Sequence, residues 1–198
     1  MNPSRLLELD ARLSAQLRVA ERPGVLRTLA AILAHSGDSW FWWAGLALLW
    51  WRGDAFWKPW APTVLFSIIA LALIVLPIKF LIRRRRPEGD WGALYRNTDP
   101  HSFPSGHAAR AIFIAVLATG LGPSWLALLL WIWAPLVSLA RVAMGVHYVS
   151  DVVAGGALGL LAGVIALLIW KTKKAFYLAS FMATLKFSSV STGVGSTP

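Results

Sequence analysis

Residues 62–82 read PTVLFSIIALALIVLPIKFLI, and four arginines and a proline follow directly at 83–87. The apolar run is long enough to cross a membrane, since about 20 apolar residues span the hydrocarbon core. Lys79 is its only charged residue. A charge at such a depth costs free energy, so an ionisable residue there is a functional-site hypothesis by default. The stretch therefore predicts a membrane protein with a functional cation near the end of one span.

The composition of the whole chain agrees with that reading. Only 14% of the 198 residues are charged, against about 25% in soluble domains, and 12 residues are Trp. Mean hydropathy is +0.61. The net charge of +10 favours anionic lipid head groups over nucleic acid as partners, because the basic residues flank apolar spans and no basic recognition helix is present. The absence of Cys excludes disulfides, thiolate catalysis and Cys-ligated metals.

Five apolar segments predict an all-α fold, a polytopic helical bundle in the membrane. They cover about 38–52, 62–82, 105–121, 124–141 and 151–170. With the spans in this order, the loops 83–104 and 142–150 fall on the same side of the membrane. In the last span, glycines recur every four residues, which is typical of a face that packs closely against another helix. These are Gly155, Gly159 and Gly163.

The two ends of the chain are predicted to lie outside the bundle. Residues 4–20 place leucines at an approximate helical period among charges, which is typical of an amphipathic helix on the bilayer surface. With a short apolar piece that ends at the turn signal Ser36-Gly37-Asp38-Ser39, this helix forms an interfacial segment, 1–37. The transmembrane domain is 38–171. The tail, 172–198, is expected to be disordered or to lie on the surface.

A pair of cations at the end of the second span is suited to an anion. Lys79 and Arg86 are seven residues apart, so on a continued helix they share one face with Arg83, about 10 Å apart along the axis. Pro87 disfavours helical geometry at Arg86 and would let its guanidinium swing inward. The planar guanidinium fork suits phosphate. Arg84 and Arg85 are interpreted as the ordinary positive flank of a transmembrane helix.

The segment Pro104-Ser105-Gly106-His107 precedes the third span. Ser105 is a good N-cap residue, and Gly106 lets the backbone approach a ligand closely. Free N–H groups at a helix start bind anions, which places His107 beside any anion bound there. The alternative is a capped helix that carries an interfacial His.

A histidine and a carboxylate precede the fifth span, spaced i, i+4. On a helical turn, Asp151 can accept the Nδ1 proton of His147 and leave Nε2 free as nucleophile or base. Arg141 lies six residues before His147, at the end of the fourth span. Alternatively Asp151 caps the fifth span, and both roles can coexist.

A metal ion held by three histidines is disfavoured at this site. The ligands would be His101, His107 and His147. Five cationic residues nearby would oppose a divalent ion, namely Lys79, Arg83, Arg86, Arg110 and Arg141. We therefore expect no metal and no other cofactor.

The three segments, in this order, resemble the signature motifs of the type 2 phosphatidic acid phosphatase superfamily. These are Lys-x6-Arg-Pro, Pro-Ser-Gly-His and Arg-x5-His-x3-Asp, and the match covers residues 79–151. The third motif usually opens with Ser-Arg, whereas Ala140 precedes Arg141 here, which removes a supporting hydroxyl. Members commonly have six spans, against the five counted in this chain.

The resemblance implies a metal-independent lipid phosphatase. By similarity, His147 attacks phosphorus to form a phosphohistidine, Asp151 orients His147, and His107 protonates the leaving alkoxide. The resemblance assigns phosphoryl binding to Lys79, Arg86, Arg141, Ser105 and the Gly106 N–H. Candidate substrates are phosphatidylglycerophosphate, phosphatidate and undecaprenyl diphosphate, with the lipid tail entering between spans from the bilayer.

Two rival functions use the same basic cluster. One is a phosphotransferase of the same superfamily that passes the phosphoryl group to another lipid or sugar. The other is a non-catalytic anion or lipid transporter, although transport does not call for a His–Asp pair beside a second His.

The expected location is a bacterial inner membrane with the site facing the extracytoplasmic side, where the family usually works. The positive residues of the opposite end favour that orientation, and the N-terminal arginines argue against it. Those residues are Arg52, Lys58, Lys171, Lys173 and Lys174.

Overall fold

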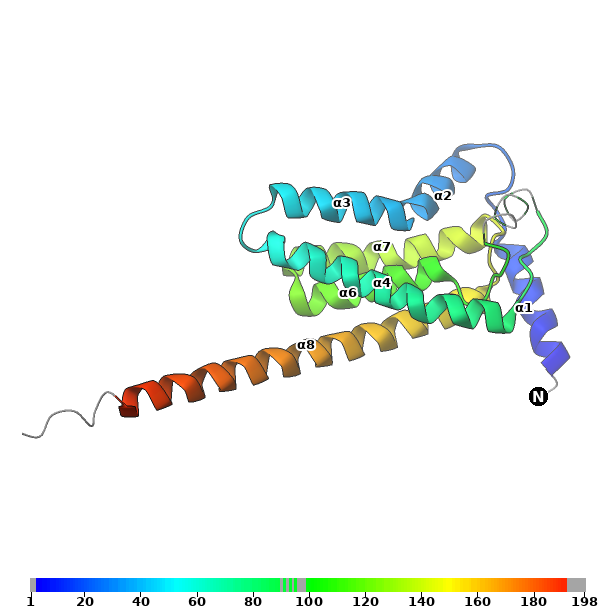
Figure 1. Ribbon diagram of the computed structural model, residues 1–198. Helices are drawn as coiled ribbons and strands as arrows, with labels where there is room; N and C mark the ends of the chain where they lie inside the picture. The colour runs from blue at the N-terminus through cyan, green and yellow to red at the C-terminus, as the bar shows by residue number, and fades with distance from the viewer. Residues whose placement is uncertain (1–2, 90, 92, 94, 96–98, 192–198) are drawn as a thin grey trace, which may run out of the picture.

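The structure is a computed structural model that describes residues 3–89, 91, 93, 95 and 99–191, and its named elements are all helices (Figure 1). They are α1 (Pro3–Leu17), α2 (Val25–Ser36), α3 (Ser39–Arg52), α4 (Trp57–Ile82), α6 (Gly106–Leu121), α7 (Ser124–Ala143) and α8 (Val149–Ser191). In Figure 1 the helices α3, α4, α6, α7 and α8 run along one direction, whereas α1 lies across their end. The expected all-α helical bundle is confirmed.

Among the described residues, three helices are long and apolar enough to cross a membrane, and two shorter ones run beside them. The long ones are Trp57–Ile82, Ser124–Ala143 and Val149–Lys173. Helices α3 and α6 have 14 and 16 residues. At 1.5 Å per residue they are about 21 and 24 Å long, less than the roughly 30 Å hydrocarbon core. The structure therefore supports a membrane-spanning helical bundle, whereas the predicted number of five spans depends on whether α3 and α6, which are short, cross the membrane.

The centre of the bundle is α6, which packs between α7 and α8. A Cβ added at Gly155 or Gly159 would overlap backbone oxygens of the α6 segment, and one at Gly163 would come within 2.8 Å of Val116. The predicted glycine face of the last span is confirmed, because only helices without side chains there can approach so closely.

The second span ends earlier than a continuous Lys79–Arg86 helix requires. Helix α4 stops at Ile82, and Arg83 caps it in the left-handed conformation, with φ 53°. Extended backbone then leads to Pro87, which disfavours helical geometry at the preceding residue. The prediction that Arg83 shares a face with Lys79 and Arg86 is therefore wrong, and the Arg83 side chain is exposed.

The tail is helical over most of its length. Helix α8 continues to Ser191 and extends well beyond the bundle (Figure 1), so residues 172–191 are helical and not disordered, and the alternative that the tail lies on the surface stays a prediction. Residues 171–191 contain no Gly or Pro, and Ala, Leu, Met and Lys favour the helix. Nothing in this stretch therefore ends the helix that the fifth span begins.

The N-terminal helix turns polar side chains toward the bundle and leucines away from it. Ser14 of α1 is buried, whereas Leu6, Leu7 and Leu13 are exposed. Because α1 lies across the bundle end, those leucines suit the membrane surface, and the interfacial role stays a prediction.

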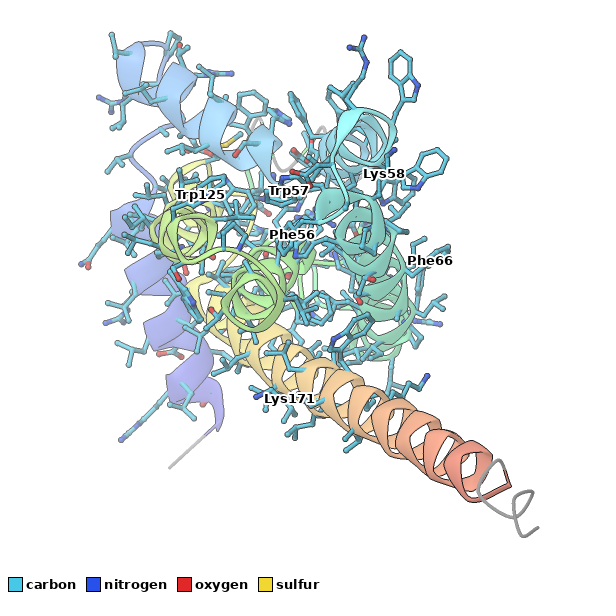
Figure 2. All side chains as sticks on the ribbon, turned by 90° about the vertical axis from the view of Figure 1, so that its left-hand side faces the viewer. Phe56, Trp57, Lys58, Phe66, Trp125 and Lys171 are labelled. Carbon is cyan, nitrogen blue, oxygen red and sulfur yellow. The ribbon has the colours of Figure 1, made fainter. Side chains whose placement is uncertain are left out.

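The opposite end of the bundle carries aromatic residues beside a lysine. Figure 2 looks at that end and shows Trp57, Lys58 and Trp125 there. The rings of Trp57 and Trp125 lie 6.5 Å apart. Tryptophans of this kind are typical of a membrane–water interface.

Candidate active site

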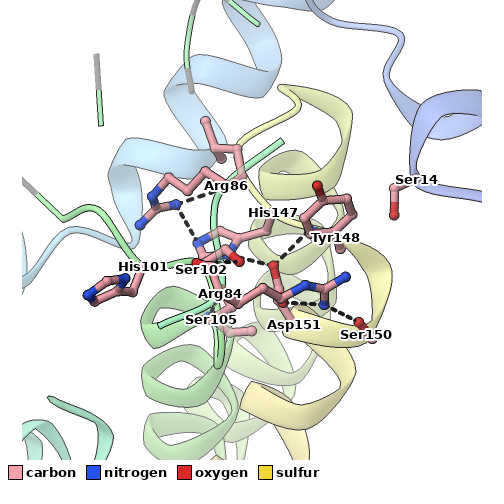
Figure 3. Close-up of polar contacts among 12 residues, drawn as sticks. Ser14, Arg84, Arg86, His101, Ser102, Ser105, His147, Tyr148, Ser150 and Asp151 are labelled. Atoms are coloured by element: carbon pink, nitrogen blue, oxygen red, sulfur yellow. Dashed lines mark hydrogen bonds and ion pairs between the residues drawn. The ribbon is translucent and has the colours of Figure 1, made fainter. Parts of the chain in front are cut away.

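The three motif segments meet at the end of the bundle that α1 covers (Figure 3). The N–H of Ser105 donates to the carbonyl of Asp151 at 2.9 Å, and Arg86 Nη1 donates to the carbonyl of Val146 at 2.9 Å. Loops far apart in the chain are thus joined on one side, as the order of spans predicts.

His147 is buried, with 1% of its surface exposed, and its Nε2 lies 3.1 Å from Arg86 Nη1. A guanidinium only donates hydrogen bonds, so Nε2 is the unprotonated ring nitrogen and Nδ1 carries the proton. Burial lowers the pKa of His147 well below its ordinary value of 6.5, and the charges of Arg86 and Arg141 act in the same direction. The result is a neutral imidazole whose unprotonated Nε2 accepts a hydrogen bond from Arg86.

Asp151 faces His147 but does not form a close hydrogen bond with it. Its Oδ2 lies 3.4 Å from His147 Nδ1 and accepts a hydrogen bond from the Tyr148 N–H at 2.9 Å. Helix α8 begins at Val149, so His147 precedes the helix instead of sharing a turn with Asp151. Asp151 therefore caps α8, in the manner of a capping box, while it stands beside the ring.

Arg84 holds the other oxygen of Asp151, which sequence reasoning missed. Its Nη1 lies 2.8 Å from Asp151 Oδ1, and its Nη2 lies 2.6 Å from Asp10 of α1 (Figure 3 shows the first contact). Asp10 also accepts from the N–H of Ser150 at 3.0 Å. The interpretation of Arg84 as an ordinary flank is therefore wrong, whereas Arg85 is exposed, as a flank should be.

Lys79 and Arg86 converge on a carboxylate, Asp99, which sequence reasoning also missed. Both cations are buried, with 4% and 3% of their surfaces exposed. Arg86 Nη2 donates to Asp99 Oδ2 at 2.8 Å, and Lys79 Nζ donates to the same oxygen. The two residues are brought together as predicted, and an internal anion stands between them.

Arg141 is fully buried beside the same cluster. It donates to the hydroxyl of Tyr95 at 3.0 Å and lies 4.5 Å from the centre of the Tyr95 ring. The guanidinium carbon of Arg86 also lies over the Tyr95 ring, 5.4 Å from its centre. Tyr95 therefore links two of the predicted phosphate-binding arginines.

The start of α6 has the predicted capped form. Ser105 is the N-cap and its hydroxyl accepts from the Ala108 N–H at 3.4 Å. A Cβ at Gly106 would meet only Val75, at 3.8 Å, so packing does not require glycine there. His107 Nε2 lies 2.6 Å from Oδ1 of Asp38, at the turn between α2 and α3.

A cavity of about 530 Å³ opens between α3, α4 and α6. One part of its wall is polar and includes Lys79, Asp99 and His107. The remainder is largely apolar, with Trp40, Trp43, Ile68, Leu71, Ala72, Val75 and Leu76. Ile68 precedes Lys79 by eleven residues of α4, about 16 Å along the helix. The cavity therefore joins a charged end to a long apolar wall.

The histidines considered as metal ligands are not gathered in one place. Within the described residues, no group of three His, Cys, Asp or Glu side chains is placed to hold a metal ion. His107 contacts Asp38, and His147 contacts Arg86.

A family model described as the PAP2 superfamily matches residues 60–175. The chain belongs to the PAP2 superfamily. It is 37% identical over 169 residues to a decaprenylphosphoryl-5-phosphoribose phosphatase of Mycobacterium tuberculosis, covering 80% of this chain and 88% of the relative. An undecaprenyl-diphosphatase of Sulfolobus acidocaldarius is 35% identical over 101 residues, 49% of this chain and 48% of that protein.

The fold of this PAP2 chain also matches a solved membrane protein. A crystal structure of a transmembrane PAP2-type phosphatidylglycerolphosphate phosphatase from Bacillus subtilis superposes with a TM-score of 0.68 at 23% identity, covering 85% of this chain and 87% of that one. The resemblance seen in the motifs is confirmed, and the protein is a membrane phosphatase of this superfamily.

Proposed function

We propose that this PAP2 phosphatase hydrolyses a phosphomonoester or diphosphate carried by a membrane lipid, through a phosphohistidine on His147. The observation that carries the proposal is the contact between His147 Nε2 and Arg86, because it identifies Nε2 as the unprotonated ring nitrogen and sets it beside a cation suited to phosphate. Lys79 and Arg86 already hold an anionic oxygen, that of Asp99. A substrate phosphate replaces that carboxylate.

In the first step, Nε2 of His147 bonds to phosphorus as the bond from phosphorus to the lipid oxygen breaks. Asp151, beside Nδ1, offsets the positive charge that develops on the ring. His107 gives its proton to the departing oxygen. Lys79 and Arg86 stabilise the negative charge on the transferred group, which is the main catalytic contribution in phosphoryl transfer.

In the second step, water attacks the phosphohistidine and the bond between phosphorus and Nε2 breaks. His107, now neutral, takes a proton from the water, and inorganic phosphate leaves. His147 returns to the neutral form that burial and the neighbouring charges favour. Both steps use the same cations, Lys79 and Arg86.

The shape of the cavity supports a lipid substrate. Its charged end, at Lys79 and His107, suits a phosphate, and its apolar wall suits a hydrocarbon chain. Trp40 and Leu76 on that wall are exposed on the outside of α3 and α4, where a lipid tail reaches them from the bilayer.

The named substrates of the relatives suggest which lipids to test first. A phosphate on a polyprenyl-linked sugar comes first, because the Mycobacterium tuberculosis relative is named for such a compound and covers most of this chain. Phosphatidylglycerophosphate, phosphatidate and undecaprenyl diphosphate follow. The proposed location is the inner membrane of a bacterium, with the site on the extracytoplasmic face.

The test is release of inorganic phosphate by purified protein in detergent with EDTA present. The substrates are the four lipids and a soluble phosphomonoester, and the variants are His147→Ala and, as a matched control, His101→Ala. We expect release that survives EDTA, is lost in His147→Ala and persists in His101→Ala. Vanadate, which resembles the transition state, should inhibit it.

Two results would contradict the proposal. Release that persists in His147→Ala would remove the phosphohistidine. Transfer of labelled phosphate to another lipid without free phosphate would indicate a phosphotransferase instead.

A further inference from the structure

A second His–Asp pair lies beside the cavity, and its carboxylate, Asp38, is outside the three motifs. His107 Nε2 is 2.6 Å from Asp38 Oδ1, and the other oxygen of Asp38 is 2.9 Å from His35 Nδ1. The Asp38 carboxylate thus lies between two imidazoles. Its hydrogen bonds with His107 and His35 hold the pKa of Asp38 below the ordinary value, although burial alone would raise it. Asp38 is therefore an anion at neutral pH.

Contacts from two other helices fix the turn that carries Asp38. Arg110, one turn after His107 on α6, donates from Nε to the Gly37 carbonyl at 2.9 Å and from Nη1 to the Ser39 hydroxyl at 2.7 Å. Trp133 of α7 donates to the Ser36 hydroxyl at 2.8 Å. The turn between α2 and α3 is thus tied to α6 and α7.

The backbone of this turn also approaches the ring of His107 closely. A Cβ at Gly37 would lie 3.2 Å from His107 Cδ2 and 2.9 Å from Val137 Cγ1. Any residue larger than glycine would therefore push the turn away from the histidine. The close approach keeps Asp38 within hydrogen-bond distance of Nε2.

The charges around His107 explain why a carboxylate is needed there. A general acid must carry a proton on both ring nitrogens, so His107 is an imidazolium before it acts. Burial of the ring acts most strongly against that positive charge, and Arg141 on α7 and Arg110 on its own helix act in the same direction. Lys79 and Asp99 face it across the cavity. Asp38 is the anion that contacts the ring directly.

We infer that Asp38 is a positioning residue that holds His107 in its acid form and aims Nδ1 at the leaving oxygen of the substrate. This inference rests on the proposed function, in which His107 protonates that oxygen. With Nε2–H donated to Asp38, Nδ1 is the nitrogen that delivers the proton. His35 supports the far oxygen of Asp38 and has a smaller effect.

The test compares two leaving groups in Asp38→Asn. One substrate is a lipid phosphomonoester, whose alkoxide needs a proton, and the other is an activated aryl phosphate, whose phenolate does not. Because general acid catalysis typically contributes about 100-fold or more, we expect kcat on the lipid to fall about 10- to 100-fold. On the aryl phosphate we expect less than about a threefold change, with KM on both substrates nearly unchanged.

Matched variants separate this role from a structural one. Asp54→Asn makes the same substitution at the other end of α3, where Asp54 accepts from the Phe56 N–H, and should leave kcat unchanged. Asp38→Glu should restore part of the lost activity, because it returns the carboxylate. In Asp38→Asn the alkaline limb of the lipid kcat profile should move to lower pH, since the imidazolium loses its counter-ion.

Combination with His107→Ala gives the decisive comparison. If Asp38 acts through His107, Asp38→Asn adds no further loss in a His107→Ala background. Given an active wild-type protein, three results would each overturn the inference. They are equal losses of kcat on both substrates, additive losses in the double variant, and an unchanged kcat in Asp38→Asn. A wild-type protein that releases no phosphate would overturn the proposed function itself. If Asp38→Asn does not fold, His35→Gln is measured instead. We expect a smaller loss of kcat, which again is larger on the lipid than on the aryl phosphate.

Discussion

The carboxylate of Asp99 lies 2.8 Å from the guanidinium of Arg86 and also accepts a hydrogen bond from Lys79. The two cations assigned to phosphate are thus already neutralised in part by the protein. Asp99 also lines the cavity, whereas His147 does not, and Arg86 contacts both residues. Substrate phosphate must therefore compete with Asp99.

Replacing this carboxylate should strengthen anion binding. In Asp99→Asn we expect the inhibition constant of vanadate to fall roughly fivefold, because a partly exposed ion pair contributes about 1 kcal/mol. The matched control is Glu88→Gln, which removes one negative charge from an exposed site in the same loop. Weaker vanadate inhibition in Asp99→Asn would show that Asp99 positions the two cations instead of competing for them.

Arg84 and Arg85 should differ sharply although they are identical neighbours. Arg84 joins Asp151 to Asp10, so Arg84→Met removes the contact that holds the Asp151 carboxylate beside His147. Small misplacements of a catalytic group can cost about 100-fold, and we expect kcat to fall about 10- to 100-fold. The exposed Arg85 should tolerate the same change, and steady-state phosphate release measures both. Equal losses in Arg84→Met and Arg85→Met would mean that only the net charge of the flank matters.

These examples show what the sequence can and cannot predict in this chain. The sequence could single out Lys79 and His107 as candidates, because an ionisable residue in an apolar span or at a helix start is unusual in itself, and His147 because of its spacing from Asp151. The partners Asp99, Arg84 and Asp38 were not predictable from any local pattern. Asp38 lies 69 positions from His107, and only the packing of α2 on α7 and of α3 on α4 brings them together.

The ends of the helices are likewise only partly predictable from the sequence. The apolar segments locate the spans to within a few residues. The end of α4 at Ile82 depends on the chain turning to bring Arg86 to His147, which is a tertiary contact.

The protonation of His147 can be measured directly. Because burial lowers its pKa well below 6.5, the neutral form that attack requires persists as the pH falls through 6.5 and is lost only at lower pH. In a nitrogen-labelled histidine NMR titration in micelles, the signal that disappears in His147→Asn should titrate well below 6.5. A signal for His147 that titrates at or above 6.5 would contradict a neutral nucleophile.

Substitution by alanine should have opposite effects on stability at Gly156 and Gly159, which lie about one turn apart on α8. A Cβ at Gly159 would overlap the carbonyl of Ala109, whereas one at Gly156 would meet only Ile112, at 3.7 Å. Gly159→Ala should therefore lower the free energy of unfolding by about 1–3 kcal/mol through overpacking. Gly156→Ala should be neutral or stabilising by about 0.5–1 kcal/mol, because alanine favours the helix. Thermal unfolding in detergent measures both, and similar losses in the two variants would refute the close packing of α8 on α6.

The orientation of the site can be tested because the chain has no Cys of its own. Ala93 is exposed in the loop at the site, and Ala55 is exposed in the turn between α3 and α4, at the opposite end. Ala93→Cys and Ala55→Cys change no charge, so neither alters the balance of positive residues that sets topology. With an extracytoplasmic site, a membrane-impermeant maleimide should label Ala93→Cys in intact cells and Ala55→Cys only after lysis. The reverse pattern would place the site in the cytoplasm, where the N-terminal arginines would follow the positive-inside rule.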